Sequence, residues 1–172
     1  MTPPSERVVN ADSTPRDPDI ERLLHGRLHE PRRVLGLHFV GAQDALVRVL
    51  LPNAKRVQLI EPAIELERVP GTALFEWRGP RTGLAAPYRI RSESHDGRWH
   101  EGYDAYSFPL EIDEHDLARF AGGSHIHAHR FLGAHERTIA GVRGIRFAVW
   151  APNAERVSVV GSFNHWDGRY HR

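Results

Sequence analysis

Residues 49–60 read Val49-Leu50-Leu51-Pro52-Asn53-Ala54-Lys55-Arg56-Val57-Gln58-Leu59-Ile60, and one hundred residues later the chain repeats them as Val149-Trp150-Ala151-Pro152-Asn153-Ala154-Glu155-Arg156-Val157-Ser158-Val159-Val160. Six of the twelve positions are identical. In each copy apolar residues alternate with others on both sides of a Pro-Asn-Ala turn, because proline presets φ and asparagine tolerates turn conformations. Each copy therefore predicts two strands joined by a short connection.

A second repeat lies upstream, where Leu35-Gly36-Leu37-His38 returns as Leu132-Gly133-Ala134-His135. Two ordered blocks at nearly one spacing indicate a module followed by a second copy of itself. The first copy continues to Phe108, whereas only twelve residues follow Val160 in the second. We therefore expect the sequence to end within its second domain.

Composition is that of an ordinary globular protein and argues against several functions. The 172 residues suffice for one to two domains, and 23 basic and 22 acidic residues leave a formal net charge of +1. This balance disfavours a nucleic-acid or membrane surface, which needs a basic excess. Because there is no cysteine, disulfides and thiolate metal sites are excluded. No segment predicts a secretory signal or a membrane span, and we expect a cytoplasmic protein.

Local signals predict a short helix followed by many strands. Residues 1–16 are polar and proline-rich, which is typical of a disordered leader. Asp17-Pro18 resembles an N-cap with proline at the first helical position, so a helix is expected near 18–28. Asp96-Gly97 predicts a hairpin with Trp99 on its returning strand. Further strands are expected around 47–51, 57–59, 73–78, 88–92 and 147–151, and from Val157 onward.

Short strands with a turn signal about every ten residues indicate an all-β fold, here an immunoglobulin-like β-sandwich followed by a truncated second β-sandwich of the same type. The chain is expected to divide into a leader (1–16), an N-terminal sandwich module with its short helix (17–108), a connector (109–130) and an incomplete second sandwich (131–172). A brief helix around 116–120 is expected within the connector.

The second copy carries motifs that resemble a known family. Residues 147–154, Phe147-Ala148-Val149-Trp150-Ala151-Pro152-Asn153-Ala154, and residues 157–166, Val157-Ser158-Val159-Val160-Gly161-Ser162-Phe163-Asn164-His165-Trp166, closely resemble the start of a family 48 carbohydrate-binding module. Such modules precede the catalytic barrel in α-amylase-superfamily enzymes. Phe131-Leu132-Gly133-Ala134-His135 resembles the entry segment of bacterial 1,4-α-glucan (glycogen) branching enzymes. A complete extra module, ending in Asp104-Ala105-Tyr106-Ser107-Phe108, is similar to the longer members of that family.

The resemblance implies the non-catalytic N-terminal portion of a branching enzyme. The family cleaves an α-1,4 linkage and transfers the chain to a 6-hydroxyl with retention, which needs two carboxyl groups about 5 Å apart. Nothing in this chain resembles the barrel segments that carry those groups. We therefore expect no catalytic residue, no cofactor and no activity from this fragment alone. The implied partners are an α-glucan (glycogen or a maltooligosaccharide) and the C-terminal catalytic barrel of the parent enzyme.

Three other interpretations stay open. The chain would also fit a free glycogen-binding or regulatory module, the N-terminus of a debranching or trehalose-forming relative, or a purely structural domain that touches no sugar. A barrel encoded directly after Arg172 would favour the branching enzyme over the free module.

Trp166 is the leading candidate for sugar contact. An indole offers a flat apolar face to the C–H face of glucose, and Asn164 and Asp167 would supply hydrogen bonds to the hydroxyls. The structural alternative is that Trp166 caps the sandwich or packs on the barrel. In the first copy Ile60-Glu61-Pro62 replaces the aromatic loop, so we expect that copy to act as a scaffold.

The other candidates favour structural roles. Trp150 takes the place of Leu50 and is typical of a core or interface residue. Trp99 stands beside a turn, where an exposed ring can meet a polysaccharide. Three histidines, His125, His127 and His129, would share one face of a strand and have the spacing to ligate Zn²⁺ with a further ligand. The matching family segment is not a metal site, so no metal site is expected.

The truncation predicts an uncovered apolar face. Without later strands, the apolar side of the second sandwich would lack partners, and unpaired strand edges would remain. We expect residues beyond about 130 to be poorly folded or paired with another chain. The side chains expected to be uncovered are Phe147, Val149, Val157 and Val159.

Overall fold

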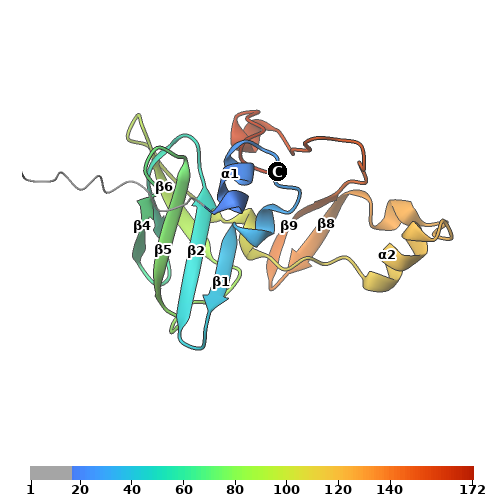
Figure 1. The fold of residues 1–172 in the computed structure, drawn as a ribbon, viewed down its shortest axis with the longest axis horizontal. Helices are drawn as coiled ribbons and strands as arrows, with labels where there is room; N and C mark the ends of the chain where they lie inside the picture. Colours follow the sequence, from blue (N-terminus) through green and yellow to red (C-terminus); the bar gives the residue numbers. More distant parts are fainter. Residues whose placement is uncertain (1–16) are drawn as a thin grey trace, which may run out of the picture.

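Nine antiparallel strands dominate the regular secondary structure of the computed structural model, which describes residues 17–172 (Figure 1). The prediction of an all-β fold is confirmed, and the predicted leader, 1–16, lies outside the described residues. Seven strands form one sheet in the order β1-β2-β5-β4-β3-β6-β7. They are β1 (Gly36–Val40), β2 (Asp44–Leu50), β3 (Ala54–Leu59), β4 (Ile64–Arg68), β5 (Leu74–Pro80), β6 (Arg89–Ser94) and β7 (Trp99–Tyr103).

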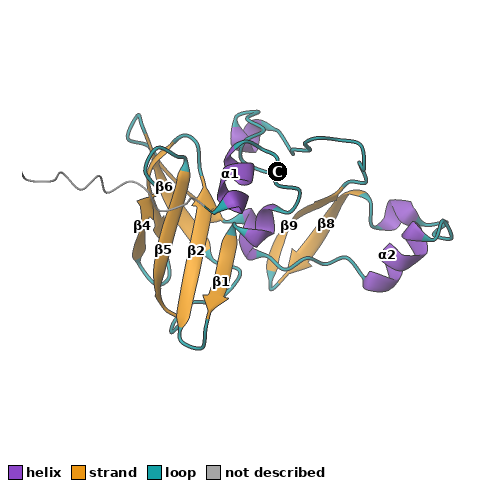
Figure 2. Ribbon diagram, in the orientation of Figure 1, coloured by secondary structure: helices purple, strands orange, loops and turns teal. Residues whose placement is uncertain are grey.

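The seven-stranded sheet folds over on itself at β4. This strand pairs with β3 through Leu66 and Val57 and with β5 through Glu67 and Glu76. The β3-β6-β7 side therefore packs against the β1-β2-β5 side as a sandwich, with β6 behind β2 and β5 in Figure 2. One apolar core fills the space between the two sides and contains Val47, Val49, Ala54, Val57, Leu59, Leu66, Phe75, Tyr88 and Ile90.

Helix α1 (Pro18–Leu24) covers a second apolar cluster beside the sandwich. Its N-cap, Asp17, accepts a hydrogen bond from a backbone N–H two residues ahead at 2.9 Å. Gly26 follows the helix with φ of +70°, a conformation that glycine adopts readily. The predicted N-terminal helix is thus confirmed. Its Leu23 packs with Leu50, which points away from the main core as the alternation along β2 predicts.

A buried carboxylate anchors the end of the first module. Asp104 accepts a 2.5 Å hydrogen bond from the Tyr88 hydroxyl and caps the short helix η2 (Ala105–Ser107). Burial raises the pKa of both Asp104 and Tyr88. Arg32 donates to the carbonyl of Phe108 at 2.5 Å. Residues far apart in sequence are thereby tied to the segment that leads out of the sandwich.

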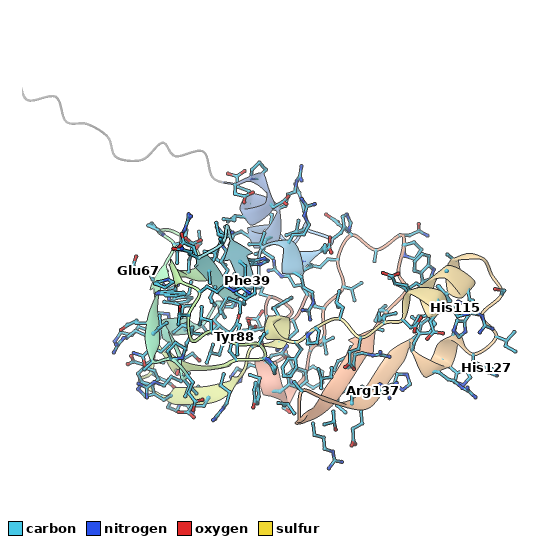
Figure 3. The ribbon with its side chains drawn as sticks, turned by 90° about the horizontal axis from the view of Figure 1, so that it is seen from below. Phe39, Glu67, Tyr88, His115, His127 and Arg137 are labelled. Atoms are coloured by element: carbon cyan, nitrogen blue, oxygen red, sulfur yellow. The ribbon has the colours of Figure 1, made fainter. Side chains whose placement is uncertain are left out.

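The connector contains the predicted helix, in a longer form. Helix α2 (Glu114–Ala121) follows its N-cap Asp113, and a short turn of helix, η3 (Ala128–Arg130), precedes the second copy. Figure 1 places α2 at the end of the molecule opposite the seven-stranded sheet. His115 and His127 lie at this same end (Figure 3).

The sequence repeat is also a structural repeat. Gly36 and Gly133 have φ of +99° and +100°, and each starts the first strand of a hairpin, β1–β2 in the first copy and β8 (Gly133–Ile139) with β9 (Val142–Ala148) in the second. His38 and His135 each hydrogen-bond the carbonyl three residues back, at 3.2 Å and 2.9 Å. The Pro-Asn-Ala turns share the same closing hydrogen bond, between an alanine N–H and the carbonyl three residues before it, at 3.2 Å and 3.0 Å.

Two strand predictions for the second copy are wrong. The strand expected through residue 151 ends at Ala148, and residues 157–160 are irregular. In the first copy the equivalent strand β3 lies between β4 and β6. Within the described residues 17–172 the second copy has no counterparts of those neighbours, so this segment finds no ladder partner. The Val159 N–H instead donates to the carbonyl of His171 at 2.9 Å.

Candidate functional site

Residues 161–168, here called the tryptophan loop, present large aromatic side chains to solvent, of which Trp166 is the most exposed. The loop begins with a short helical turn, η4 (Ser162–Asn164), and then reverses through His165 and Trp166, which have φ of +56° and +60°. Left-handed conformations are uncommon outside glycine, and two in succession turn the chain sharply. The Trp166 side chain is consequently 71% exposed.

Asn164 braces the loop from inside. It is only 2% exposed. Its Oδ1 accepts from the Gly161 N–H at 2.9 Å, and its Nδ2 donates to the Val159 carbonyl at 2.8 Å and to Nδ1 of His171 at 3.0 Å. The amide that we expected to bind sugar is thus occupied by protein partners, and Asn164 holds the reversal that exposes Trp166.

Asp167 follows Trp166 in the chain and forms half of an ion pair. Its Oδ2 accepts from Arg169 Nη2 at 2.6 Å and its Oδ1 from Arg169 Nε at 2.9 Å. This hydrogen bonding lowers the pKa of Asp167. Arg169 was not identified from the sequence, because its link to the loop is a side-chain contact that no motif carries. The pair supplies a carboxylate and a guanidinium group within three residues of Trp166 in sequence.

Phe163 is a second exposed aromatic residue of the loop. It was not among the residues predicted from the sequence to contact sugar. It is 63% exposed, and its ring lies 5.5 Å from that of His171. A Cβ at Gly161 would overlap the Phe163 ring, so a larger residue there would displace that ring. Phe163 was visible in the sequence motif, but its closeness to Gly161 and His171 was not.

The loop and the last residues of the chain return to the first module. Figure 1 shows the C-terminus beside α1. The Tyr106 hydroxyl donates to the Arg172 carbonyl at 2.9 Å, and the Arg172 side chain contacts the Leu23 carbonyl. A cavity of about 860 Å³ lies between the two copies, and its lining includes Tyr106 and Phe163.

Comparison with known families agrees with this arrangement. Residues 16–106, more than half of the chain, match the N-terminal domain of alpha-1,4-glucan branching enzyme GlgB. The chain belongs to this GlgB N-terminal domain family. Residues 131–172, which include the tryptophan loop, match carbohydrate-binding module 48, the isoamylase N-terminal domain.

Relatives named 1,4-alpha-glucan branching enzyme GlgB share much of this sequence. That of Nitrosospira multiformis is 44% identical over 170 residues, covering 95% of this chain and 22% of the relative. Those of Methylobacillus flagellatus and Nitrosomonas eutropha are 45% and 47% identical, covering 91% and 86% of this chain and 22% and 20% of the relatives. The chain thus spans about a fifth of the length of the curated relatives it matches, as their N-terminal portion.

The expected uncovered apolar face of the GlgB-type second copy is largely present. Phe147, Val149 and Val157 are 47%, 62% and 42% exposed. Val159 is half-buried, because its backbone pairs with the returning C-terminal segment. Apolar area of this kind on a domain surface marks a place where another surface packs or a ligand binds.

The other tryptophans of this GlgB-family chain differ in environment. Trp150 is 64% exposed, and its ring packs edge-on against Phe120 of α2, with centroids 5.3 Å apart. Trp77 is half-buried against the main core. Trp99 is 44% exposed on the edge strand β7. Trp150 therefore packs, as expected, but its partner is Phe120 of the connector.

The histidine-rich segment is not a strand. Residues 128–130 form η3, and His125 Nε2 donates to Asp116 Oδ1 at 2.8 Å while its ring lies 5.1 Å from Phe131. The three histidines would share a face only on a strand, and this condition is not met, because Gly122-Gly123 and the helical turn break the extended backbone. Among residues 17–172, no group of three or more His, Asp or Glu side chains is arranged to hold a metal ion.

No helix in the described range is long and apolar enough to cross a membrane. The acidic residues of the connector serve local structure, since Asp113 caps α2 by accepting from the His115 N–H at 2.7 Å.

Proposed function

We propose that this chain is the non-catalytic N-terminal portion of a glycogen branching enzyme and that its tryptophan loop contacts α-glucan. The observation that carries the proposal is the exposed ring of Trp166 within the segment that matches a carbohydrate-binding module. The substrate class follows from the relatives, which are named 1,4-alpha-glucan branching enzymes.

We infer a role for each expected site residue. The Trp166 ring provides the apolar face on which a glucose unit stacks. Asp167 and Arg169 hydrogen-bond the sugar hydroxyls, with the ion pair holding the two side chains together. Asn164 positions the loop and does not touch sugar.

In the parent enzyme the C-terminal barrel would perform the reaction. Cleavage of an α-1,4 linkage and transfer to a 6-hydroxyl would occur there with retention. The two N-terminal modules would hold the glucan and orient it toward the barrel. They comprise residues 17–108 and 131–172 and are joined by the connector 109–130. Glycogen is an intracellular store, so the cytoplasm is the proposed location.

A second role for the same surface is packing against the barrel. The exposed Phe147, Val149 and Val157 and the cavity between the copies favour it. An interface of this kind would cover the apolar side chains while leaving the Trp166 ring at its rim available to sugar.

Affinity gel electrophoresis in glycogen tests the sugar contact. Replacing Trp166 with alanine removes the stacking face and should weaken the apparent affinity about fivefold, the loss of about 1 kcal/mol. Phe39→Ala is the matched control, because Phe39 is also exposed, at 51%, but lies on β1 away from the loop.

The two variants separate the two roles. Loss of retardation in Trp166→Ala but not in Phe39→Ala supports sugar contact. If the unaltered chain migrates equally with and without glycogen, or if Trp166→Ala migrates as the unaltered chain does, the loop does not bind glucan and the packing role remains.

A further inference from the structure

The outer face of β3, β6 and β7 carries a second exposed indole, far from the tryptophan loop in sequence. Strand alternation places Val57 and Ile90 in the core, so Arg56, Arg91 and their neighbours point outward. Trp99 on β7 lies directly opposite Glu93 on β6 and is therefore on this outer face as well. The indole is 44% exposed.

Two guanidinium groups fix the orientation of the Trp99 ring. The Arg91 Cζ lies 5.2 Å from the ring centroid and the Arg56 Cζ lies 5.9 Å from it. Because β7 is the edge strand and β6 separates it from β3, the ring must lean across β6 to approach Arg56. Cation–π contacts hold the ring in this position before any ligand arrives.

Charge on this face is nearly balanced and locally paired. Arg56 bonds Glu65 at 2.8 Å, and Arg91 bonds the Gln58 side chain at 2.6 Å. Two other ligand classes fit this face poorly. A polyanion needs a surplus of positive charge and a lipid surface needs contiguous apolar area, and this face has neither. The charged side chains on it are Lys55, Arg56, Arg89 and Arg91 against Glu65, Glu93 and Glu101.

A hollow of about 470 Å³ lies beside Arg56, whose guanidinium contacts the Trp99 ring. Arg56 and Glu65 line it and also belong to the face that carries Trp99, while Trp99 itself is outside the lining. The flat ring, with fixed donors and acceptors around it, has the chemistry that a neutral, polyhydroxylated chain requires.

We propose that the Trp99 face is a second α-glucan contact, located on the module expected to act as a scaffold, where the turn beside Trp99 was the one sequence feature that pointed to sugar. The apolar face of one glucose unit lies on the indole, and Arg91, Gln58 and Glu101 hydrogen-bond the hydroxyls of that unit and its neighbour. The choice of α-glucan as the ligand rests on the function proposed above. Two contacts on one chain raise the affinity for a branched polymer through avidity.

The competing interpretation is that Trp99 covers the arginine side chains and only stabilises the sheet. Removing the ring would then lower the melting temperature and leave glucan binding unchanged. Measuring both properties for the same variants distinguishes the two roles.

Affinity electrophoresis of the full 172-residue chain in glycogen, with and without Trp166→Ala, tests the proposal. We expect Trp99→Ala to weaken the apparent affinity about fivefold in either background, and Trp99→Phe to retain most of it. His100→Ala is the matched control, because His100 is an exposed neighbour on β7 that points to the opposite face. Should Trp99→Ala fold poorly, Trp99→Phe and Arg91→Gln decide in its place, with Arg91→Gln expected to bind more weakly.

Each result has one meaning. Weaker glycogen binding by Trp99→Ala, with unchanged binding by His100→Ala, supports the Trp99 site. If Trp166→Ala has no effect on binding, only the contact proposed for the tryptophan loop is removed, and the Trp99 site stands. Retardation of Trp99→Ala equal to that of the unaltered chain in both backgrounds overturns the proposal. A Trp99-dependent interaction with dextran sulfate that glycogen does not reproduce overturns it too, because the face would then be an anion site.

Discussion

At the scale of single residues, the Asn164 amide determines the protonation of His171. The Gly161 N–H donates to Asn164 Oδ1, which identifies that atom as the amide oxygen and the other as the nitrogen, Nδ2. Nδ2 must then donate to Nδ1 of His171, at 3.0 Å, so the imidazole is neutral with its proton on Nε2. Burial also lowers the pKa of His171. The loop that carries Trp166 therefore depends on a neutral histidine.

Acid should loosen the tryptophan loop. Because the folded-state pKa of His171 lies below the unfolded value of about 6.5, the unfolded form binds more protons as the pH falls below that value. The stabilising contribution is complete above about pH 6.5 and decreases as the pH falls toward the lowered pKa. We expect glycogen retardation to be weaker at about pH 5.5 than at about pH 7.5.

Replacing His171 with asparagine tests this origin of the pH dependence, because an asparagine Oδ1 accepts from Asn164 at any of these pH values. Glycogen retardation of His171→Asn should change little over the range. His165→Asn, at an exposed position of the same loop, should retain the dependence. A His171→Asn variant whose retardation declines in acid as steeply as that of the unaltered chain would show that another group is responsible.

At the scale of elements, the repeated Leu-Gly-x-His junction performs one task in two surroundings. In both copies a glycine with φ near +100° lets the chain turn from a short helix into the first strand of a hairpin. The surroundings differ, because a Cβ at Gly36 would lie 2.7 Å from the Tyr106 carbonyl oxygen. The nearest atom to a Cβ at Gly133 would be a side-chain nitrogen of His135 at 3.8 Å.

Alanine at the two glycines should therefore have unequal effects. Both substitutions carry the strain of a positive φ, roughly 1–3 kcal/mol. Gly36→Ala also forces the Asp104-anchored η2 segment to move, so we expect it to lower the melting temperature of the first module by more than 5 °C or so. Gly133→Ala should leave that transition in place. Thermal unfolding followed by circular dichroism measures both, and equal effects would contradict the structural difference between the copies.

At the scale of the whole molecule, the two copies differ in how completely their strands are paired. The first copy closes a core between both sides of its sheet and covers a further cluster with α1. The second copy, in the described residues, has one hairpin and an irregular segment held by contacts to Arg172 and Tyr106. The first copy therefore has a closed core, whereas the tryptophan loop of the second copy lies in a segment with fewer strand partners.

Much of this architecture could be predicted from local sequence signals. Alternation along residues 47–51 and the Asp96-Gly97 turn fixed strands and a hairpin, because both depend on neighbours in sequence. Strand β4 was missed because one buried residue, Leu66, stands between charged ones. The turn beside Trp99 pointed to an exposed ring, but the arginines around that ring and the bracing role of Asn164 were not predictable, since they depend on register across three strands and on the return of His171.

The central claim is that the chain meets α-glucan through specific exposed indoles, and its four tryptophans occupy four different environments. The direct test is to titrate the ¹⁵N-labelled chain with maltoheptaose and follow the four indole N–H resonances by NMR. We expect those of Trp166 and Trp99 to shift and saturate, while those of the half-buried Trp77 and the Phe120-packed Trp150 stay in place. A Trp166 resonance that does not move at saturating maltoheptaose would contradict the account.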